Sequence, residues 1–266
     1  MAFLPQYEVL ALRYAVNDRQ IAAHNFIDGD DHDRLMPLDY FMWVARSGDK
    51  VFLIDTGFDA EAAAMRGRRL LASPAERLHQ AGLKAEEISD IIITHLHYDH
   101  AGNRDLFTNA RFHIQDREMA YATGRCMCHT ALRSAFDGRD VAAMVNRVFE
   151  GRVCFHDGTV TLAPGIELHR VGGHTDGLQV VRIWTRRGWM VIASDASHFY
   201  ANMQEGRSFP IVYNLGDMYE GHQTCYRLAD HPAAVIPGHD PLVTLRYPPL
   251  RPGLEGMVMR LDAEPL

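Results

Sequence analysis

The chain has 266 residues, of which 47% are hydrophobic and 23% are charged, and its formal net charge is −7. This composition is typical of a folded globular protein that is long enough to bury a large core. The acidic balance argues against a nucleic-acid-binding surface, which usually needs a basic patch. No apolar run approaches the ~20 residues of a membrane span. We therefore expect neither nucleic acid nor membrane as a partner.

The opening residues and the cysteines predict a cytoplasmic protein. Residues 1–8 lack a basic stretch that leads into a long apolar one, so no signal peptide is expected. Cysteines are too few and too scattered for a disulfide framework, and we expect them to be reduced: Cys126, Cys128, Cys154 and Cys225.

Apolar runs and turn residues predict the elements in chain order. Strands are expected over residues 7–14, 40–45, 51–54, 91–94, 111–115, 153–155, 166–171, 178–184, 189–194 and 233–236. Helices are expected over residues 60–67, 74–81 (capped by Ser73), 117–123, part of 134–150, and 219–229, with a short turn at 86–88. Residues 248–252 are expected to begin a C-terminal tail.

A repeated hairpin pattern indicates the architecture. Residues 40–55 and 178–195 each contain an apolar strand, a turn with glycine, and a second apolar strand that ends in aspartate. The repeat predicts two related β-rich halves within a single domain that spans residues 1–266. Hairpins in place of strict strand–helix alternation favour an α/β protein built as a four-layer αββα sandwich. Residues 124–151 are predicted to be a helical insertion in this domain.

The most informative stretch is His95-Leu96-His97-Tyr98-Asp99-His100, which directly follows the predicted strand at 91–94. Imidazoles and carboxylates are the ligands that zinc and similar metals prefer. A strand that ends in such a cluster brings these side chains to one point at the edge of a sheet. Building a core does not require this cluster, so the stretch predicts a metal site.

Three later residues extend the predicted metal site. His174 lies in a glycine-rich turn between two predicted strands, Asp195 ends the second hairpin, and His239 follows the strand at 233–236. Each lies in a turn of small residues at a strand end, where the backbone can come close and direct a side chain inward.

The hexad 95–100 followed in the chain by His174, Asp195 and His239 resembles the motif pattern of the metallo-β-lactamase-fold hydrolases. The resemblance covers residues 40–240. It implies that His95, His97 and His174 hold one metal ion. It also implies that Asp99, His100 and His239 hold a second ion and that Asp195 bridges the two. The implied cofactors are two divalent metal ions, zinc in the first place, with Mn²⁺, Fe²⁺ or Co²⁺ as alternatives.

The same resemblance implies a hydrolytic mechanism. A water between two such metals loses a proton near neutral pH and becomes the nucleophile. One metal would polarise the substrate carbonyl, and the other would stabilise the leaving alkoxide. Asp99 would accept the proton and return it to the leaving oxygen.

Within this superfamily, the second half of the chain is most similar to the N-acyl homoserine lactonase group. The residues that carry the similarity are Gly173-His174-Thr175-Asp176-Gly177-Leu178-Gln179, Asp195-Ala196-Ser197 and Gly238-His239-Asp240. Two positions depart from the group's pattern. Asp176 replaces a proline, and His198 replaces a tyrosine that contacts the substrate carbonyl, with Tyr200 two residues further on. We expect His198 or Tyr200 to donate a hydrogen bond to the carbonyl oxygen.

The sequence therefore predicts a hydrolase that opens the ring of a small lactone, either an N-acyl homoserine lactone or another. A thioesterase and a hydrolase of cyclic amides are the alternatives with the same metal centre. A dioxygenase relative with one iron is a further alternative. The expected partner is a small lactone or ester, and a homodimer is left open. Cys126-Met127-Cys128-His129 has a poor spacing for zinc and is expected to pack or to line a pocket.

Overall fold

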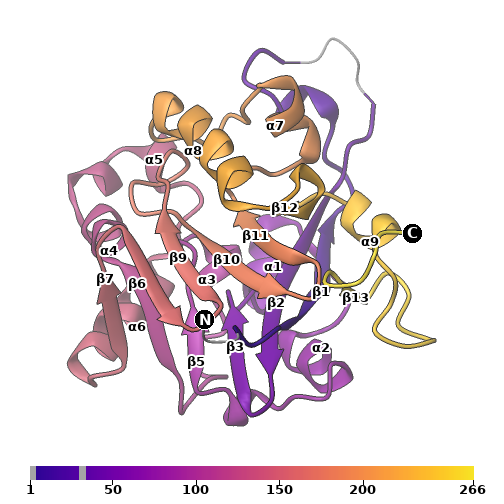
Figure 1. Cartoon of the computed structure of the whole chain (residues 1–266). Helices are drawn as coiled ribbons and strands as arrows, with labels where there is room; N and C mark the ends of the chain where they lie inside the picture. The colour runs from indigo at the N-terminus through magenta and orange to yellow at the C-terminus, as the bar shows by residue number, and fades with distance from the viewer. Residues whose placement is uncertain (1–3, 30–33) are drawn as a thin grey trace.

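The computed structural model describes residues 4–29 and 34–266, and the strands of this part of the chain form two sheets (Figure 1). The larger sheet has the order β13-β1-β2-β3-β5-β6-β7, with β4 paired to β1. Its strands are β1 (Glu8–Asn17), β2 (Leu38–Ser47), β3 (Lys50–Ile54), β4 (Arg69–Leu70), β5 (Asp90–Ile92), β6 (Arg111–Gln115), β7 (Val153–His156) and β13 (Val258–Arg260). The smaller sheet has the order β12-β11-β10-β9-β8. Its strands are β8 (Thr159–Ala163), β9 (Ile166–Arg170), β10 (Gln179–Thr185), β11 (Gly188–Ser194) and β12 (Val235–Pro237).

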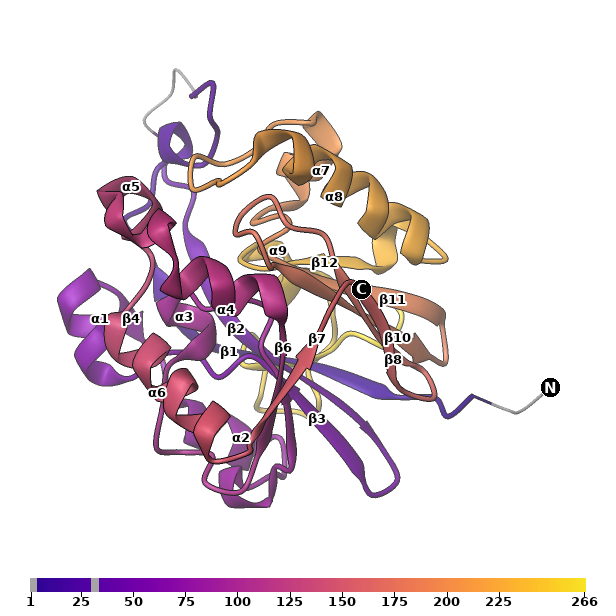
Figure 2. The same cartoon turned by 90° about the vertical axis from the view of Figure 1, so that its left-hand side faces the viewer.

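Helices cover the outer faces of both sheets. The α-helices are α1 (Ala60–Arg66), α2 (Pro74–Gln80), α3 (Tyr98–Ala101), α4 (Asp116–Thr123), α5 (Thr130–Arg133), α6 (Gly138–Phe149), α7 (Tyr200–Glu205), α8 (Leu215–Leu228) and α9 (Leu242–Arg246). Short 3₁₀ helices are η1 (Ala22–His24), η2 (Ala85–Glu87), η3 (Arg125–Cys128) and η4 (Pro232–Ala234). Figure 2 shows α1, α2 and α6 outside the larger sheet and α7 and α8 outside the smaller one. This arrangement confirms the predicted four-layer αββα fold.

Strand β2 shows why the larger sheet is buried on both faces. Alternate residues of a strand point to opposite faces. Phe41 and Trp43 pack between the two sheets, whereas Met42 and Val44 pack under the helices on the other side. All four are at most 2% exposed. Full burial of such a side chain contributes about 1.5–3 kcal/mol, so this strand is an anchor of both apolar layers.

The strand directions bring several loops to one edge of the molecule. Strands β3, β5 and β6 are parallel neighbours in the larger sheet, and β11 is parallel to β12 in the smaller sheet. The carboxyl ends of parallel strands lie at the same sheet edge, where ligands bind in open α/β sheets. The hexad 95–100 follows β5, Asp195 follows β11, and His239 follows β12.

The two predicted hairpins form, and they belong to different sheets. The first is β2–β3 in the larger sheet, and the second is β10–β11 in the smaller sheet. The predicted strands and helices agree with the structure to within a few residues at most ends. The predicted helix at 219–229 begins earlier, at Leu215, where the Asn214 side chain caps the first turn. The region 124–151 contains η3, α5 and α6; its status as an insertion stays a prediction.

Two predicted elements near the end of the chain need correction. The expected strand at 233–236 begins later, because Pro232–Ala234 form a 3₁₀ helix before β12. The expected C-terminal tail instead returns to the larger sheet, where β13 pairs with β1 and buries Val258 and Met259. A strand of three residues is too short to give a periodic signal. The strands β4 and β8 and the helices α3, α5, α7 and α9 were likewise not predicted.

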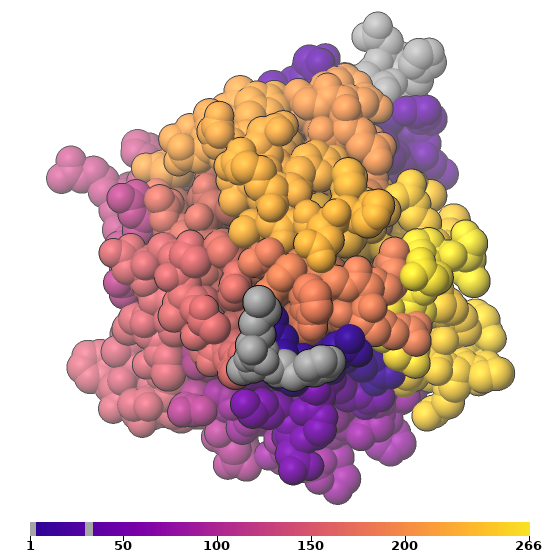
Figure 3. All heavy atoms as spheres, in the orientation of Figure 1, coloured from indigo at the N-terminus to yellow at the C-terminus, as the bar shows by residue number. Residues whose placement is uncertain are grey.

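The space-filling view shows the surface that these layers present (Figure 3). Orange and yellow residues from the last third of the chain form much of the face in view. Within the described residues, no helix is both long enough and apolar enough to cross a membrane.

The start of α2 offers a test of local stability. The Ser73 hydroxyl accepts a hydrogen bond from the Glu76 N–H, and the Glu76 carboxylate accepts one from the Ser73 N–H. We predict that Ser73→Ala lowers the free energy of unfolding by about 1 kcal/mol, because the first turn loses a cap. Urea denaturation measures this change.

The matched control is Glu76→Gln, whose amide oxygen can still accept from the Ser73 N–H. Its effect should be smaller than that of Ser73→Ala. Equal stability of Ser73→Ala and the unmodified protein would contradict this account of the helix start.

Candidate metal centre

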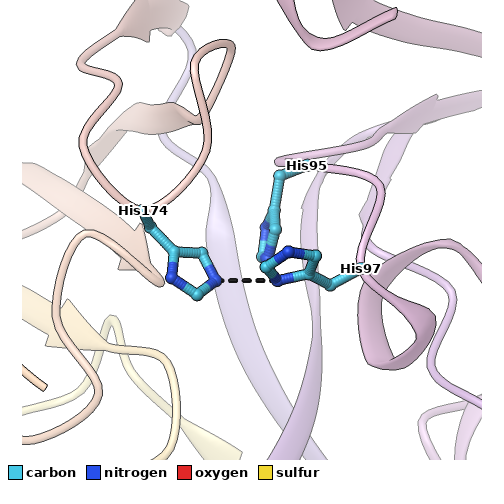
Figure 4. Close-up of side chains that lie close together, drawn as sticks. All are labelled: His95, His97 and His174. Carbon is cyan, nitrogen blue, oxygen red and sulfur yellow. Dashed lines mark hydrogen bonds between the residues drawn. The ribbon is translucent and has the colours of Figure 1, made fainter. Parts of the chain in front are cut away.

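Three histidine side chains converge from two loops (Figure 4). His95 and His97 follow β5, and His174 comes from the turn between β9 and β10. The Nδ1 atom of His97 lies 3.1 Å from His95 Nε2 and 2.8 Å from His174 Nε2. The turn that carries His174 requires glycine at position 173, where φ is +90° and a Cβ would lie 2.6 Å from the backbone of Met218.

A second group forms beside the first. Helix α3 turns the chain directly after His97, so that Asp99 and His100 point to the same side as His239. The Oδ2 atom of Asp99 lies 3.6 Å from His100 Nε2 and 3.7 Å from His239 Nε2. All three residues are buried.

Asp195 lies between the two groups. Its Oδ1 atom is 3.0 Å from His239 Nε2 and 3.4 Å from His100 Nε2. Its Oδ2 atom is 3.2 Å from His174 Nε2 and 3.8 Å from His95 Nε2. One carboxylate oxygen therefore faces each group.

The outer nitrogens of the histidines are held by the protein. His100 Nδ1 lies 2.7 Å from the Asp55 carboxylate. His174 Nδ1 lies 2.6 Å from the carbonyl oxygen of Ile211, and His239 Nδ1 lies 2.8 Å from that of Asp39. Such contacts fix the tautomer and the ring orientation and leave Nε2 free to face the centre.

Two strained residues lie at the strand ends that carry the centre. Asp55 and Ser194 have φ values of +61° and +45°, which are rare for residues other than glycine. The Thr94 hydroxyl contacts both, at 2.8 Å from Asp55 Oδ2 and 2.9 Å from Ser194 Oγ. Such strain persists where the surroundings fix the backbone and is common at functional sites. The sequence pattern identified Asp55 only as the aspartate that ends the first predicted hairpin.

Glu118, on α4, was missed by the sequence analysis. Its buried carboxylate accepts hydrogen bonds from the Leu96 N–H at 2.8 Å, the Thr175 hydroxyl at 2.5 Å and the Gly177 N–H at 3.1 Å. Burial raises the pKa of Glu118 to about 6 despite these donors. The side chain thus ties the loop of His95 and His97 to the loop of His174. The signal in the sequence was one acidic residue in an amphipathic helix, which is normally exposed.

The electrostatics separate the histidines into two kinds. Burial, and then the neighbouring imidazoles, lower the pKa values of His95 and His97 well below the ordinary value. Burial also disfavours the charged form of His100, but nearby carboxylates, led by Asp195, raise its pKa well above the ordinary value. Burial opposes the charge of Asp195, yet His239 and the other imidazoles hold its pKa well below the usual range. His95 and His97 are therefore favoured as neutral imidazoles and Asp195 as a carboxylate, which are the protonation states in which such side chains bind metals. A cation bound at His100 would have to displace the proton that the carboxylates favour there.

The donor set fits divalent cations. His100 Nε2 and Asp195 Oδ1 are buried, and their short contacts within the centre do not have the geometry of hydrogen bonds. Buried polar atoms without a partner are rare and costly, and a metal ion is one way to satisfy them. The side chains form overlapping groups whose ligand atoms lie within 4.8 Å of one another: His95, His97 and His174; His95, His100 and Asp195; Asp99, His100 and His239; and His174, Asp195 and His198. Cys126 and Cys128 belong to none of these groups of described residues.

A cavity of about 270 Å³ opens onto the centre. Its walls include Asp99 and His198, two of the predicted catalytic residues. The His198 ring stacks on Phe209 with a centroid distance of 3.4 Å, and its Nε2 atom lies 3.0 Å from Asp195 Oδ2. Burial lowers the pKa of His198 to about 4, although Asp195 opposes the shift.

Tyr200, the other predicted substrate contact, does not line this cavity. Helix α7 begins at Tyr200, and the buried ring belongs to the apolar cluster that also contains Val243 and Tyr247. There the guanidinium of Arg246 lies 4.1 Å from the ring centroid. Of the two predicted substrate contacts, His198 lines this cavity and Tyr200 does not. Which side chain donates to a substrate carbonyl stays a prediction.

The family is decided by a comparison with family models. Residues 35–239 match the model of the metallo-beta-lactamase superfamily. The chain belongs to this superfamily. The matched region contains the hexad, His174, Asp195 and His239, so the sequence-based recognition of the family is confirmed.

Relatives of this metallo-β-lactamase-superfamily chain include proteins named as N-acyl homoserine lactonases. The chain is 29% identical over 189 residues to N-acyl homoserine lactonase AiiB of Agrobacterium fabrum, covering 64% of this chain and 67% of the relative. It is 24% identical over 188 residues to N-acyl homoserine lactonase AiiA of Bacillus thuringiensis subsp. kurstaki, covering 65% and 69%.

Solved structures share the fold at lower identity. An N-acyl homoserine lactone hydrolase with the product N-hexanoyl-L-homoserine bound at its metal centre has a TM-score of 0.70 and 19% identity, covering 90% of this chain and 94% of the other. The dizinc quorum-quenching lactonase AidC has a TM-score of 0.68 and 18% identity, covering 90% and 89%.

Glu118 provides a test of how the centre is held. We predict that Glu118→Ala weakens metal binding about 10- to 100-fold, the usual effect of removing a residue that supports metal ligands. Competition with a chromophoric chelator measures the affinity. The metal affinity of Glu118→Gln should lie between that of Glu118→Ala and that of the unmodified protein, because an amide oxygen can replace one of the two carboxylate oxygens.

The control is Glu150→Ala, which removes an exposed carboxylate beyond the end of α6. It should leave metal affinity unchanged. If Glu118→Ala and Glu150→Ala bound metal equally well, Glu118 would not be a support of the centre.

Proposed function

We propose that the protein is a two-metal hydrolase that opens the ring of a small lactone. The observation that carries this proposal is the position of Asp195, whose two oxygens face two separate groups of metal-ligand side chains. A carboxylate in this position suits a bridge between two cations. A single metal site would need only one of the two groups.

The proposed ligands are those that the resemblance implies. His95, His97 and His174 would hold one ion, Asp99, His100 and His239 the other, and Asp195 both. Zinc fits this donor set of imidazoles and carboxylates, and the related AidC is a dizinc lactonase. Two bound divalent ions would lower the pKa of a shared water and polarise the ester carbonyl.

Asp99 is the proposed proton carrier. It lines the cavity and is 8% exposed, so a substrate can approach its carboxylate. A carboxylate beside the attacking water can accept its proton and return it to the leaving oxygen of the ring. The alkoxide that leaves a lactone is a poor leaving group, which makes this second transfer valuable.

His198 has a proposed role in orienting Asp195. The low pKa of His198 keeps its imidazole neutral at pH 7, with a single N–H. Nε2 faces Asp195 at 3.0 Å, so the N–H can be donated to that carboxylate. The ring would then hold Asp195 from the cavity side. The sequence-based prediction was that His198 donates to the substrate carbonyl. For that, the Nε2 proton would have to leave Asp195 and face the substrate.

The relatives favour lactones over other substrates of the same fold. Both AiiB and AiiA are N-acyl homoserine lactonases, and a solved neighbour holds a ring-opened homoserine product at its metal centre. The sequence identities to AiiB and AiiA are 29% and 24%. At this level of similarity, the relatives support lactone hydrolysis as the reaction class and do not specify an acyl group.

Turnover of a substrate panel tests the proposal. The zinc-loaded and manganese-loaded proteins would be assayed with lactones, thioesters, β-lactams, other cyclic amides and phosphodiesters. We expect lactones to be hydrolysed with the highest kcat/KM. Preferred hydrolysis of thioesters or of cyclic amides would replace the lactonase proposal by one of its alternatives, and one iron per chain with dioxygenase activity would overturn hydrolysis itself.

Asp99→Asn tests the proton carrier. We predict that kcat for the best lactone falls about 10²- to 10⁴-fold, the range expected for loss of a general acid–base group. Metal content is measured on the same samples, because Asp99 is also a proposed ligand. The control is Asp105→Asn, an exposed residue outside the centre, which should retain full activity. Retained kcat in Asp99→Asn with two metals bound would exclude Asp99 as the proton carrier.

A further inference from the structure

The cavity beside the metal centre contains two arginines that the proposed mechanism does not use. Arg66 and Arg68 both line it. Apart from Asp99 and Asp195, which belong to the metal centre, the described lining residues include no carboxylate. Among the described residues, the hydrogen bonds of the two guanidinium groups go to carbonyl oxygens and to the Tyr98 hydroxyl, and neither forms an ion pair with a carboxylate. The carboxylate whose charge acts on Arg68 is that of Asp99, in the same cavity.

Local structure places the two arginines on either side of one turn. Helix α1 ends at Arg66, and Gly67 follows with φ of +62°, donating its N–H to the carbonyl oxygens of Ala63 and Ala64. The N–H of Arg68 then returns to the carbonyl oxygen of Ala63 at 2.8 Å. This is the glycine-dependent end of a helix, and it directs both side chains toward Tyr98.

The guanidinium of Arg66 is fixed by the protein. Its two terminal nitrogens donate to the carbonyl oxygens of Ser134 and Phe136, each at 3.0 Å. Its central carbon lies 3.9 Å from the centroid of the Tyr98 ring. Arg66 therefore contributes a positive charge to the cavity wall but has few donors left for a ligand.

Arg68 differs because its terminal nitrogens are available. Only its Nε has a side-chain partner among the described residues, the Tyr98 hydroxyl at 3.2 Å. The hydrogen bond fixes the plane of the guanidinium and leaves the two terminal amino groups without a protein acceptor. A planar pair of donors on a held guanidinium matches the two oxygens of an anionic group.

We propose that Arg68, supported by the charge of Arg66, binds an anionic oxygen group of the substrate. The substrate would be a small lactone with an ionised group such as a carboxylate, in contrast to the uncharged N-acyl homoserine lactones. The cavity volume of about 270 Å³ lies just below the roughly 300–1,000 Å³ that is usual for ligand pockets, which favours a small substrate. This inference rests on the proposed lactonase function and specifies its substrate class.

A matched pair of substrates tests the proposal. One is 5-oxotetrahydrofuran-2-carboxylate, a lactone with a carboxylate on the ring, and the other is its carboxamide, which is similar in size but neutral. We expect the metal-loaded protein to prefer the carboxylate in kcat/KM. The corresponding phosphate-bearing lactone, as a third substrate, distinguishes a carboxylate from a phosphate as the preferred anion.

Arg68→Met should reduce the preference for carboxylate over carboxamide about 10- to 100-fold, the range for loss of a hydrogen-bonded charge pair. The change should appear mainly in KM, because Arg68 is proposed to bind the substrate and not to take part in bond breaking. Arg68→Lys keeps the charge but loses the paired donors, so it should recover part of the preference. The control is Arg69→Met, which removes an exposed arginine paired with Asp18 outside the cavity and should keep the full preference.

Product binding gives a readout without turnover. We expect 2-hydroxyglutarate, the opened form of the charged lactone, to bind the metal-loaded protein more tightly than 4-hydroxybutyrate does. Arg68→Met should abolish the difference.

The outcomes separate the two proposals. If neutral lactones were hydrolysed as well as the charged one, or if Arg68→Met and Arg69→Met kept the same preference, the anion site would be overturned and the lactonase proposal would stand. If no lactone of any charge were hydrolysed, both would be overturned. If Arg68→Met does not fold, the comparison of the carboxylate and carboxamide lactones on the unmodified protein still tests the anion site.

Discussion

The shared carboxylate of Asp195 is the interaction on which the rest of the site depends. It joins side chains from both sheets, because His95 and His100 follow β5 of the larger sheet, whereas Asp195 itself follows β11 of the smaller one. A buried carboxylate is stable only when charge and hydrogen bonds compensate its desolvation. In this protein, the compensation comes from imidazoles that are themselves buried. The two sheets must therefore meet at a fixed distance for the centre to form.

The layers around the centre supply this fixed distance. The apolar side chains between the sheets set their separation, and the Thr94 hydroxyl links the two strained strand ends directly. Glu118 then ties two of the ligand loops together from outside. Because a cluster of buried nitrogens and carboxylates is costly without a cation, metal binding and stability should be coupled in this protein. Cations that bind only the folded state would stabilise the fold as well as the reaction.

The sequence predicted those parts of the molecule that repeat or that form compact motifs. Apolar runs joined by glycine-containing turns identified both hairpins, and the hexad 95–100 identified the cluster because its six residues are consecutive. The fold followed from the order of strands and helices. The short elements were not predicted, because β13 and α3 have too few residues to show a periodic pattern.

The positions of side chains outside the metal-ligand motifs could not be predicted from the sequence. Glu118 looks like an exposed helix residue until the fold buries it against the loop of His174. Tyr200 is close to Asp195 in sequence, but its buried ring does not line the cavity. Arg68 became relevant only when the turn at Gly67 brought it to the cavity wall. In each case, the deciding information is the direction of a side chain, which a linear pattern does not contain.

The central claim is that the side chains around Asp195 form one centre for two metal ions. The most direct measurement is calorimetric titration of the metal-free protein with Zn²⁺, combined with elemental analysis of the saturated protein. The account predicts two zinc ions per chain, and it predicts that Asp195→Asn weakens the binding of both. Saturation at one ion per chain, or an Asp195→Asn protein that binds two ions as tightly as the unmodified one, would contradict it.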